Sequence, residues 1–150
     1  MSDKLITLKQ VTKIWEKSQE DNTKAIEYLK KERGIEIVQS PVGYIENHRI
    51  DSSFFLKDVL VFPLFGADGK IKGVNTRKSY DKFFIRILCS SYPLIYSNYE
   101  FFDKTHVVVE SPICALTLRP FLPGIEVSAS LSASMTEQTV TLLSTSKSIS

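Results

Sequence analysis

The sequence predicts an α+β protein, in which a small mixed lobe of helices and a β-hairpin is followed by a partial α/β unit with a parallel sheet. Three observations favour this class. Apolar residues recur at helical spacing near the N-terminus, two apolar runs flank a tight turn in mid-chain, and strands alternate with helices from Thr105 onward. We therefore expect an N-terminal lobe over residues 1–104 and a truncated β-α-β-α unit over residues 105–150.

Two short helices are expected at the start of the N-terminal lobe, in LKQVTKIWEK and DNTKAIEYLKKERG. Asp21 or Asn22 is a suitable N-terminal cap for the second helix, and basic residues in its last turn complement the helix dipole. Gly34 stands where a left-handed C-terminal cap belongs. The following stretch, IEIVQSPVGYIENHRID, has no clear period and is expected to be extended and loop-like.

A β-hairpin is predicted in the middle of the chain. VLVFPLF and IKGVNTR read as strands, and Asp68 and Gly69 between them supply the positive backbone dihedrals of a tight turn. Pro63 has no N–H to donate, so the first strand is expected to lie at a sheet edge or to carry a bulge.

The C-terminal unit is predicted from the order of its segments. HVVVE is a strand, PICALTLRPF is a helix begun by Pro112, GIEVSAS is a second strand, and SMTEQTVTLLS is a second helix. This alternation implies a parallel sheet, in which functional groups gather at the carboxyl ends of the strands. Glu110 is at such an end, although the first solvated residue after a buried strand is also often an acid. The Ser- and Thr-rich residues 128–150 suggest either a frayed end or a sheet completed by another polypeptide.

Composition limits the class of protein. The 150 residues are 43% hydrophobic, which suffices for a buried core, and no apolar stretch approaches the roughly 20 residues of a membrane span. The N-terminus has no signal-peptide pattern, so we expect a soluble cytoplasmic protein. Cys89 and Cys114 have no paired spacing and are expected to be small buried hydrophobes. His48 and His106 belong to no metal-spacing motif.

Basic residues are concentrated between Phe65 and Ser90, where six of them stand against two acids. This excess predicts a phosphate-binding face, and the alternative is a solvated strand edge guarded by lysines. The six basic residues are Lys70, Lys72, Arg77, Lys78, Lys82 and Arg86.

Five segments occur in the order and at about the spacing found in the catalytic core of DnaG-type primases of bacteria and phages. They are KAIEYLKKERGI, VGYI, VFPLFGADGKIKGVNTR, LIYSNYEFF and VVVESPICAL. The chain resembles that family over most of its length. In the family a Phe-Pro hairpin is followed by a TOPRIM fold whose first strand ends in a glutamate, and ESPICAL is similar to the Glu-Ser-Pro-Ile-Asp-Ala-Leu version of that motif.

This resemblance implies template-directed synthesis of RNA primers in DNA replication, with single-stranded DNA and nucleotides as partners and a replicative helicase as a further one. In the family, magnesium or manganese held by clustered carboxylates neutralises charge during the attack of a 3′-hydroxyl on an α-phosphate. Glu110 matches the glutamate that serves at the metal and in acid–base chemistry. Arg77 matches the arginine after the hairpin and Lys82 falls near a basic residue of the family, and these two positions would meet nucleotide phosphate or template backbone. Lys72, Lys78 and Arg86 are expected to bind nucleic acid because of the local excess of basic charge.

The chain also departs from the family pattern. Cys114 stands where the family usually has an aspartate, no Asp-x-Asp occurs in the chain, and the family's zinc-binding module has no counterpart. The chain ends about where a third TOPRIM strand should begin. We therefore expect a primase fragment or subunit whose metal site is completed by a second segment carrying Asp-x-Asp. The alternative is a non-catalytic module that binds single-stranded nucleic acid or another replication protein.

Overall fold

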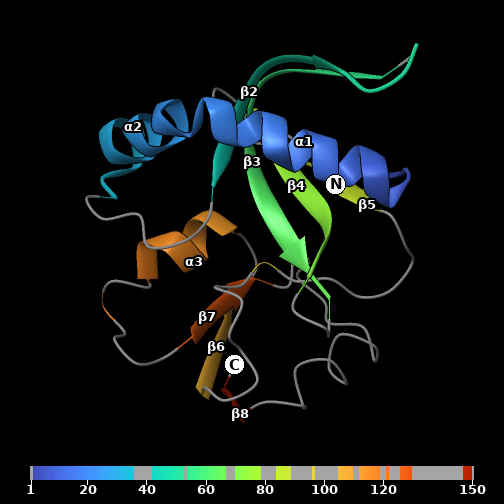
Figure 1. Ribbon diagram of the computed structural model, residues 1–150. Helices are drawn as coiled ribbons and strands as arrows, with labels where there is room; N and C mark the ends of the chain where they lie inside the picture. The colour runs from blue at the N-terminus through green and yellow to red at the C-terminus, as the bar shows by residue number, and fades with distance from the viewer. Residues whose placement is uncertain are drawn as a thin grey trace.

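A computed structural model gives the fold of the protein and describes residues 2–35, 42–52, 54–66, 70–78, 84–88, 96, 105–109, 112–118, 121, 126–129 and 147–149. These residues contain the helices and strands of two sheets (Figure 1). In chain order the elements are β1 (Ser2–Leu5), α1 (Leu8–Glu20), α2 (Asn22–Arg33), β2 (Gly43–Arg49), β3 (Phe55–Phe65), β4 (Ile71–Lys78), β5 (Phe84–Leu88), β6 (Thr105–Val109), α3 (Pro112–Leu118), β7 (Glu126–Ala129) and β8 (Lys147–Ile149). The α+β class is confirmed.

The larger sheet has the strand order β1-β5-β4-β3-β2. β1 is parallel to β5, and the other neighbours are antiparallel. The predicted β3–β4 hairpin is confirmed, and its Asp68-Gly69 turn lies outside the described residues. The sequence predicts a loop-like stretch before the hairpin, and this is wrong for Gly43–Arg49. These residues form β2, which has a partly alternating burial pattern and pairs with β3.

Pro63 does not lie in an edge strand, since β3 runs between β2 and β4. The sheet tolerates it because β2 pairs with β3 only as far as Val61, so Pro63 has a partner on the β4 side alone. The register shifts nearby, where Leu64 is paired with Gly73 and Phe65 with Ile71. The expectation that the first strand lies at a sheet edge is therefore wrong, and the bulge near Pro63 has its additional residue, Lys72, in β4 and not in the first strand as expected.

Both predicted N-terminal helices form. Thr7 begins α1 with a capping box, in which its Oγ1 accepts from the Gln10 N–H at 3.2 Å and its own N–H donates to Gln10 Oε1 at 2.9 Å. Asp21 is the N-cap residue of α2 but makes no capping hydrogen bond with its side chain. Gly34 ends α2 at a φ of 68°, as its position predicts.

The smaller sheet has the order β7-β6-β8, and both pairs are parallel. The predicted strand, helix and strand of residues 105–129 correspond to β6, α3 and β7, and α3 packs against both strands. The expectation that the sheet stops after two strands is wrong, because β8 pairs with β6 near the C-terminus. The predicted second helix lies outside the described residues. Whether these strands belong to a TOPRIM fold stays a prediction.

One hydrophobic core joins the two sheets. It contains apolar side chains of α2, of one face of β3, of α3 and of β7. Tyr96 links the layers, because its backbone forms a two-hydrogen-bond bridge with Ala129 of β7 and its ring meets Phe62 of β3 edge to face at 5.5 Å. The units expected over residues 1–104 and 105–150 thus share this core. A second core lies beneath α1, on the opposite face of β3.

Candidate functional site

Strand β4 carries three of the predicted basic site residues, and it runs inside the larger sheet between β3 and β5. The alternative of a solvated strand edge guarded by lysines therefore does not explain the positions of Lys72, Arg77 and Lys78. Lys82 lies outside the described residues. For Arg86 only the backbone is described: it lies in β5, where it is paired with Asn75 of β4.

The register divides these basic residues between the two faces of the sheet. Arg77 is paired with Leu60, which belongs to the core shared by both sheets. Lys78 is paired with Val59, which belongs to the core beneath α1. Directly opposed residues share a face and successive residues alternate, so Arg77 and Lys78 lie on opposite faces. Lys72 is the additional residue of the bulge, and the single basic face expected from the sequence does not form here.

Arg77 is almost completely buried, with 6% of its surface exposed. Taking a guanidinium out of water is costly unless polar groups surround it, and Arg77 does have an interaction partner. Asn75, two residues earlier on the same face, is 0% exposed. Within the described part of the chain, neither its Oδ1 nor its Nδ2 has a hydrogen-bond partner. The face of β4 that carries Asn75 and Arg77 is thus unusually polar for a surface directed at the core between the two sheets.

The carboxyl ends of the parallel strands meet the same core. β6 ends at Val109 and β7 at Ala129, which are partners in register. Val109 packs against the shared core, and Ala129 is buried in it. Glu110 itself lies outside the described residues, between Val109 and the first helical residue Pro112. The end of the strand before Glu110 therefore packs on the side of the larger sheet that carries Arg77.

The described residues do not make up a magnesium site. They contain no group of three or more His, Cys, Asp or Glu side chains placed to hold a metal ion. Cys114 is exposed on α3, so the expectation of a buried thiol is wrong, and a soft thiolate is a poor ligand for magnesium. Cys89 lies outside the described residues. A magnesium or manganese site stays a prediction that depends on Glu110 and on further carboxylates.

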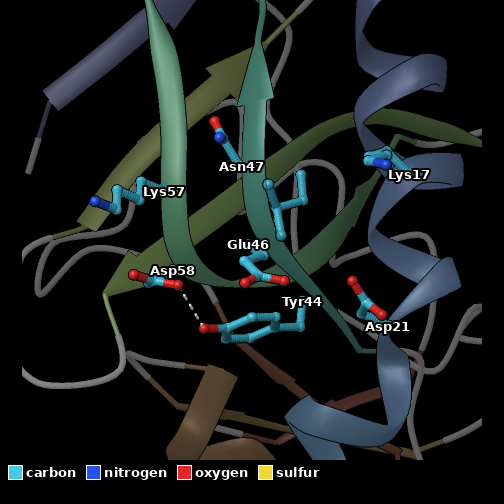
Figure 2. Close-up of a pocket in the computed structure, with 8 residues that line it drawn as sticks. Lys17, Asp21, Tyr44, Glu46, Asn47, Lys57 and Asp58 are labelled. Atoms are coloured by element: carbon cyan, nitrogen blue, oxygen red, sulfur yellow. Dashed lines mark hydrogen bonds between the residues drawn. The ribbon is translucent and has the colours of Figure 1, made fainter.

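A separate pocket of about 400 Å³ opens between the end of α1 and strands β2 and β3 (Figure 2). None of the predicted site residues lines it. Its lining residues carry charges of both signs and come from segments far apart in sequence, so no local motif predicts it. They are Lys17, Asp21, Tyr44, Ile45, Glu46, Asn47, Lys57 and Asp58.

Asp58 has a backbone φ of 50°, which is unusual for a residue with a side chain. Its Oδ1 accepts a hydrogen bond of 3.0 Å from the Tyr44 hydroxyl (Figure 2). Lys24 is 5.6 Å from the centre of the Tyr44 ring, and its Nζ donates to Glu46 Oε2 at 3.2 Å. Burial, and then the hydrogen bond to Asp58, raises the pKa of Tyr44 to about 12. Tyr44 is therefore a neutral hydrogen-bond donor and not a phenolate nucleophile at neutral pH.

His48, further along β2, is half-buried beside α1. Burial lowers the pKa of its imidazole, and the charges of Lys17 and Lys13 lower it further. The imidazole is therefore neutral at physiological pH. It belongs to no metal-binding group within the described residues.

Comparisons of the chain with protein-family models, with curated proteins and with solved structures give no match. Among the described residues, no helix is long and apolar enough to cross a membrane. The resemblance to DnaG-type primases consequently depends on the five ordered sequence motifs alone.

Proposed function

We propose that the chain is part of a DnaG-type DNA primase. It would contribute the lobe that binds template and nucleotide, together with the first glutamate of the metal site. A second segment that carries Asp-x-Asp would complete that site. The observation that supports this proposal best is the burial of Arg77 in an interior strand, on the sheet face against which the strand before Glu110 packs.

Phosphoryl transfer requires fixed positive charge near the phosphate, and a buried guanidinium supplies it well. Its donors match phosphate oxygens in pairs, and a low-dielectric surrounding strengthens the attraction. Because β4 is hydrogen-bonded on both sides, the backbone beneath Arg77 is held firmly in place. A charge fixed in this way costs little reorganisation when a phosphate binds.

A second candidate is a non-catalytic module that binds single-stranded nucleic acid. Two sequence observations favour it: Cys114 replaces the aspartate of the glutamate motif, and Asp-x-Asp is absent from the 150 residues. In this case Arg77, Lys78 and Lys82 would contact phosphates, and Glu110 would have no chemical role.

Binding of a fluorescent single-stranded DNA oligonucleotide, measured by anisotropy at several salt concentrations, tests what both candidates share. Arg77→Met keeps the side-chain length and removes the charge, and we expect it to weaken binding and to lower the salt slope by about one. Arg49→Met is the matched control, because Arg49 is exposed in β2 and stacks 6.0 Å from the Phe55 ring. Since Arg77→Met also removes a buried group, Arg77→Lys, which keeps a positive charge on the same face of β4, serves as a second, milder variant.

Salt-independent or absent binding of the oligonucleotide by the unmodified chain would refute both candidates. Equal losses in Arg77→Met and Arg49→Met would refute the role of Arg77. Glu110→Gln then separates the two candidates. In the assembly completed by an Asp-x-Asp segment, the primase proposal requires loss of primer synthesis with oligonucleotide binding retained. The binding-module proposal requires a wild-type assembly that makes no primer.

A further inference from the structure

The pocket between the end of α1 and strands β2 and β3 can be reached from solvent, because Glu46, Asn47 and Lys57 of its lining are exposed. Its volume of about 400 Å³ is enough for a small ligand. Most small-molecule sites are lined by apolar side chains, whereas charged and polar side chains predominate here. The lining therefore favours a small charged ligand over an aromatic or lipid-like one.

One part of the pocket is suited to an ammonium group. The carboxylates of Asp21, Glu46 and Asp58 lie around one aromatic ring (Figure 2). That ring belongs to Tyr44, and the charges of all three carboxylates act on its hydroxyl. Lys24 does not line the pocket, but its Nζ is 5.6 Å from the centre of the Tyr44 ring and donates to Glu46 Oε2 at 3.2 Å. An ammonium group of the chain itself is thus already held there by the ring and a carboxylate.

Asp21 is the carboxylate most available to a ligand. It is half-buried, its side chain makes no capping hydrogen bond to α2, and it belongs to no ion pair within the described residues. By contrast, Asp58 accepts from the Tyr44 hydroxyl, and Glu46 accepts from Lys24. Because a partly desolvated carboxylate is stabilised by a cation, a ligand ammonium group would find its strongest partner in Asp21.

A positive charge stands one helical turn before this carboxylate. Lys17 and Asp21 are four residues apart, a spacing that puts Cβ atoms roughly 5–6 Å from each other, and both line the pocket. The two do not pair, since Lys17 Nζ is 3.5 Å from Glu20 Oε2 in an ion pair whose side chains are 45% and 64% exposed. Such an exposed pair is weak, so Lys17 can turn to a ligand. Lys57 also lines the pocket, but its ammonium group points away from the carboxylates (Figure 2).

We propose that this pocket binds a free α-amino acid, with the ligand's ammonium group at Asp21 beside the Tyr44 ring and its carboxylate at Lys17. An α-amino acid carries both charges on substituents of one carbon atom, which suits two opposite charges one helical turn apart. A simple amine would leave Lys17 without a ligand partner, and a simple carboxylate would meet the negative side chains of the pocket. None of the residues in the proposed primase site lines this pocket, so the two proposals are tested separately.

The test is an NMR titration of the unmodified chain with L-serine and with two matched fragments of it. Ethanolamine lacks the carboxylate of serine, and β-hydroxypropionate lacks its ammonium group. Serine should shift the signals of Tyr44 and of the Asn47 side-chain amide, and it should bind about 10-fold more tightly than either fragment, the effect of one charge-assisted contact. A fragment that binds as tightly as serine would overturn the inference, and so would signals of Tyr44 and Asn47 that serine leaves in place.

Two variants assign the charges. Asp21→Asn keeps a residue suited to the N-cap position and removes the negative charge, and Lys17→Met removes the positive charge of an exposed side chain. Each should weaken serine binding about 10-fold, and Lys17→Met should leave ethanolamine binding unchanged. Lys9→Met and Glu27→Gln are the matched controls, because both residues are exposed, in α1 and α2, and neither lines the pocket. Losses in the controls as large as those in the pocket variants would overturn the inference and assign binding to overall charge.

Discussion

Gly43, the first residue of β2, lies directly against α1, and Gly43→Ala tests how tightly the helix packs on the sheet. A Cβ at this position would clash with Ser18 Oγ and would be 2.5 Å from Ser18 Cβ and 2.8 Å from Ser18 O. Rotation of the serine side chain cannot relieve these contacts, because its Cβ and backbone oxygen are among the three atoms. Ser18 Oγ also donates to the Trp15 carbonyl at 2.6 Å, and Gln19 Nε2 donates to the Val42 carbonyl at 3.1 Å.

The required movement sets the size of the effect. For ordinary contact the Cβ-to-Cβ distance must grow by about 0.9 Å, from 2.5 Å to 3.4 Å, so α1 must lift from β2. Ile14 of α1 is fully buried in the core beneath it and would lose contacts with that core. Overpacking of this kind costs about 1–3 kcal/mol, and we expect the upper end, about 3 kcal/mol. For a chain of this length, that loss lowers Tm by about 6–12 °C.

Urea denaturation followed by circular dichroism measures the free energy of unfolding of each variant. Gly34→Ala is the control, because no atom lies within 4 Å of its added Cβ and only the φ of 68° is unfavourable, at about 1–2 kcal/mol. Ser18→Gly removes two of the three clashing atoms, so it should recover part of the loss in a double variant with Gly43→Ala. A Gly43→Ala variant as stable as Gly34→Ala, or additive losses in the double variant, would refute the steric reasoning.

Two further predictions concern titration. The pKa of Tyr44, raised to about 12, means that its contribution to stability is complete below pH 10 and is lost as the pH rises toward 12. Absorbance titration should therefore include a late-titrating phenol that Asp58→Asn shifts to lower pH, and an unchanged curve would contradict the role of that hydrogen bond. Because the pKa of His48 is lowered from 6.5, stability from its neutral form is full above that pH and declines as the pH falls below it. Lys17→Met should raise the pKa of His48 in NMR titration and Lys24→Met should not, whereas equal shifts would assign the effect to overall charge.

Local patterns in the sequence predict much of this fold. The left-handed cap at Gly34, the β3–β4 hairpin and the helix begun by Pro112 all depend on neighbouring residues, and each forms as expected. Elements that depend on distant partners are not predictable in this way. β1 and β5 are adjacent in space but far apart in sequence, and β8 becomes a strand by pairing with β6.

The candidate site is harder to predict than the elements that hold it. A count of charges along the sequence places Arg77 and Lys78 in one basic cluster. The pairing of β4 with β3 shows that they lie on opposite faces of the sheet. Sequence reasoning also passes over Asn75, because asparagine in a strand is not remarkable until its burial without partners is known. The pocket beside Tyr44 brings residues of α1, β2 and β3 together and has no signature within any one segment.

The shared core bears on how the two halves of the chain can cooperate. Phe62 of β3 and Ala129 of β7 both contact Tyr96. The smaller sheet is therefore packed against the larger one and is not connected to it by the chain alone. Chemistry that depends on position needs its groups held within a fraction of an ångström, which packed side chains achieve and flexible connections do not. An Arg77 variant and a Glu110 variant should therefore affect one activity together if the primase proposal is correct. If the chain only binds nucleic acid, the same packing serves stability, and the two variants should act independently.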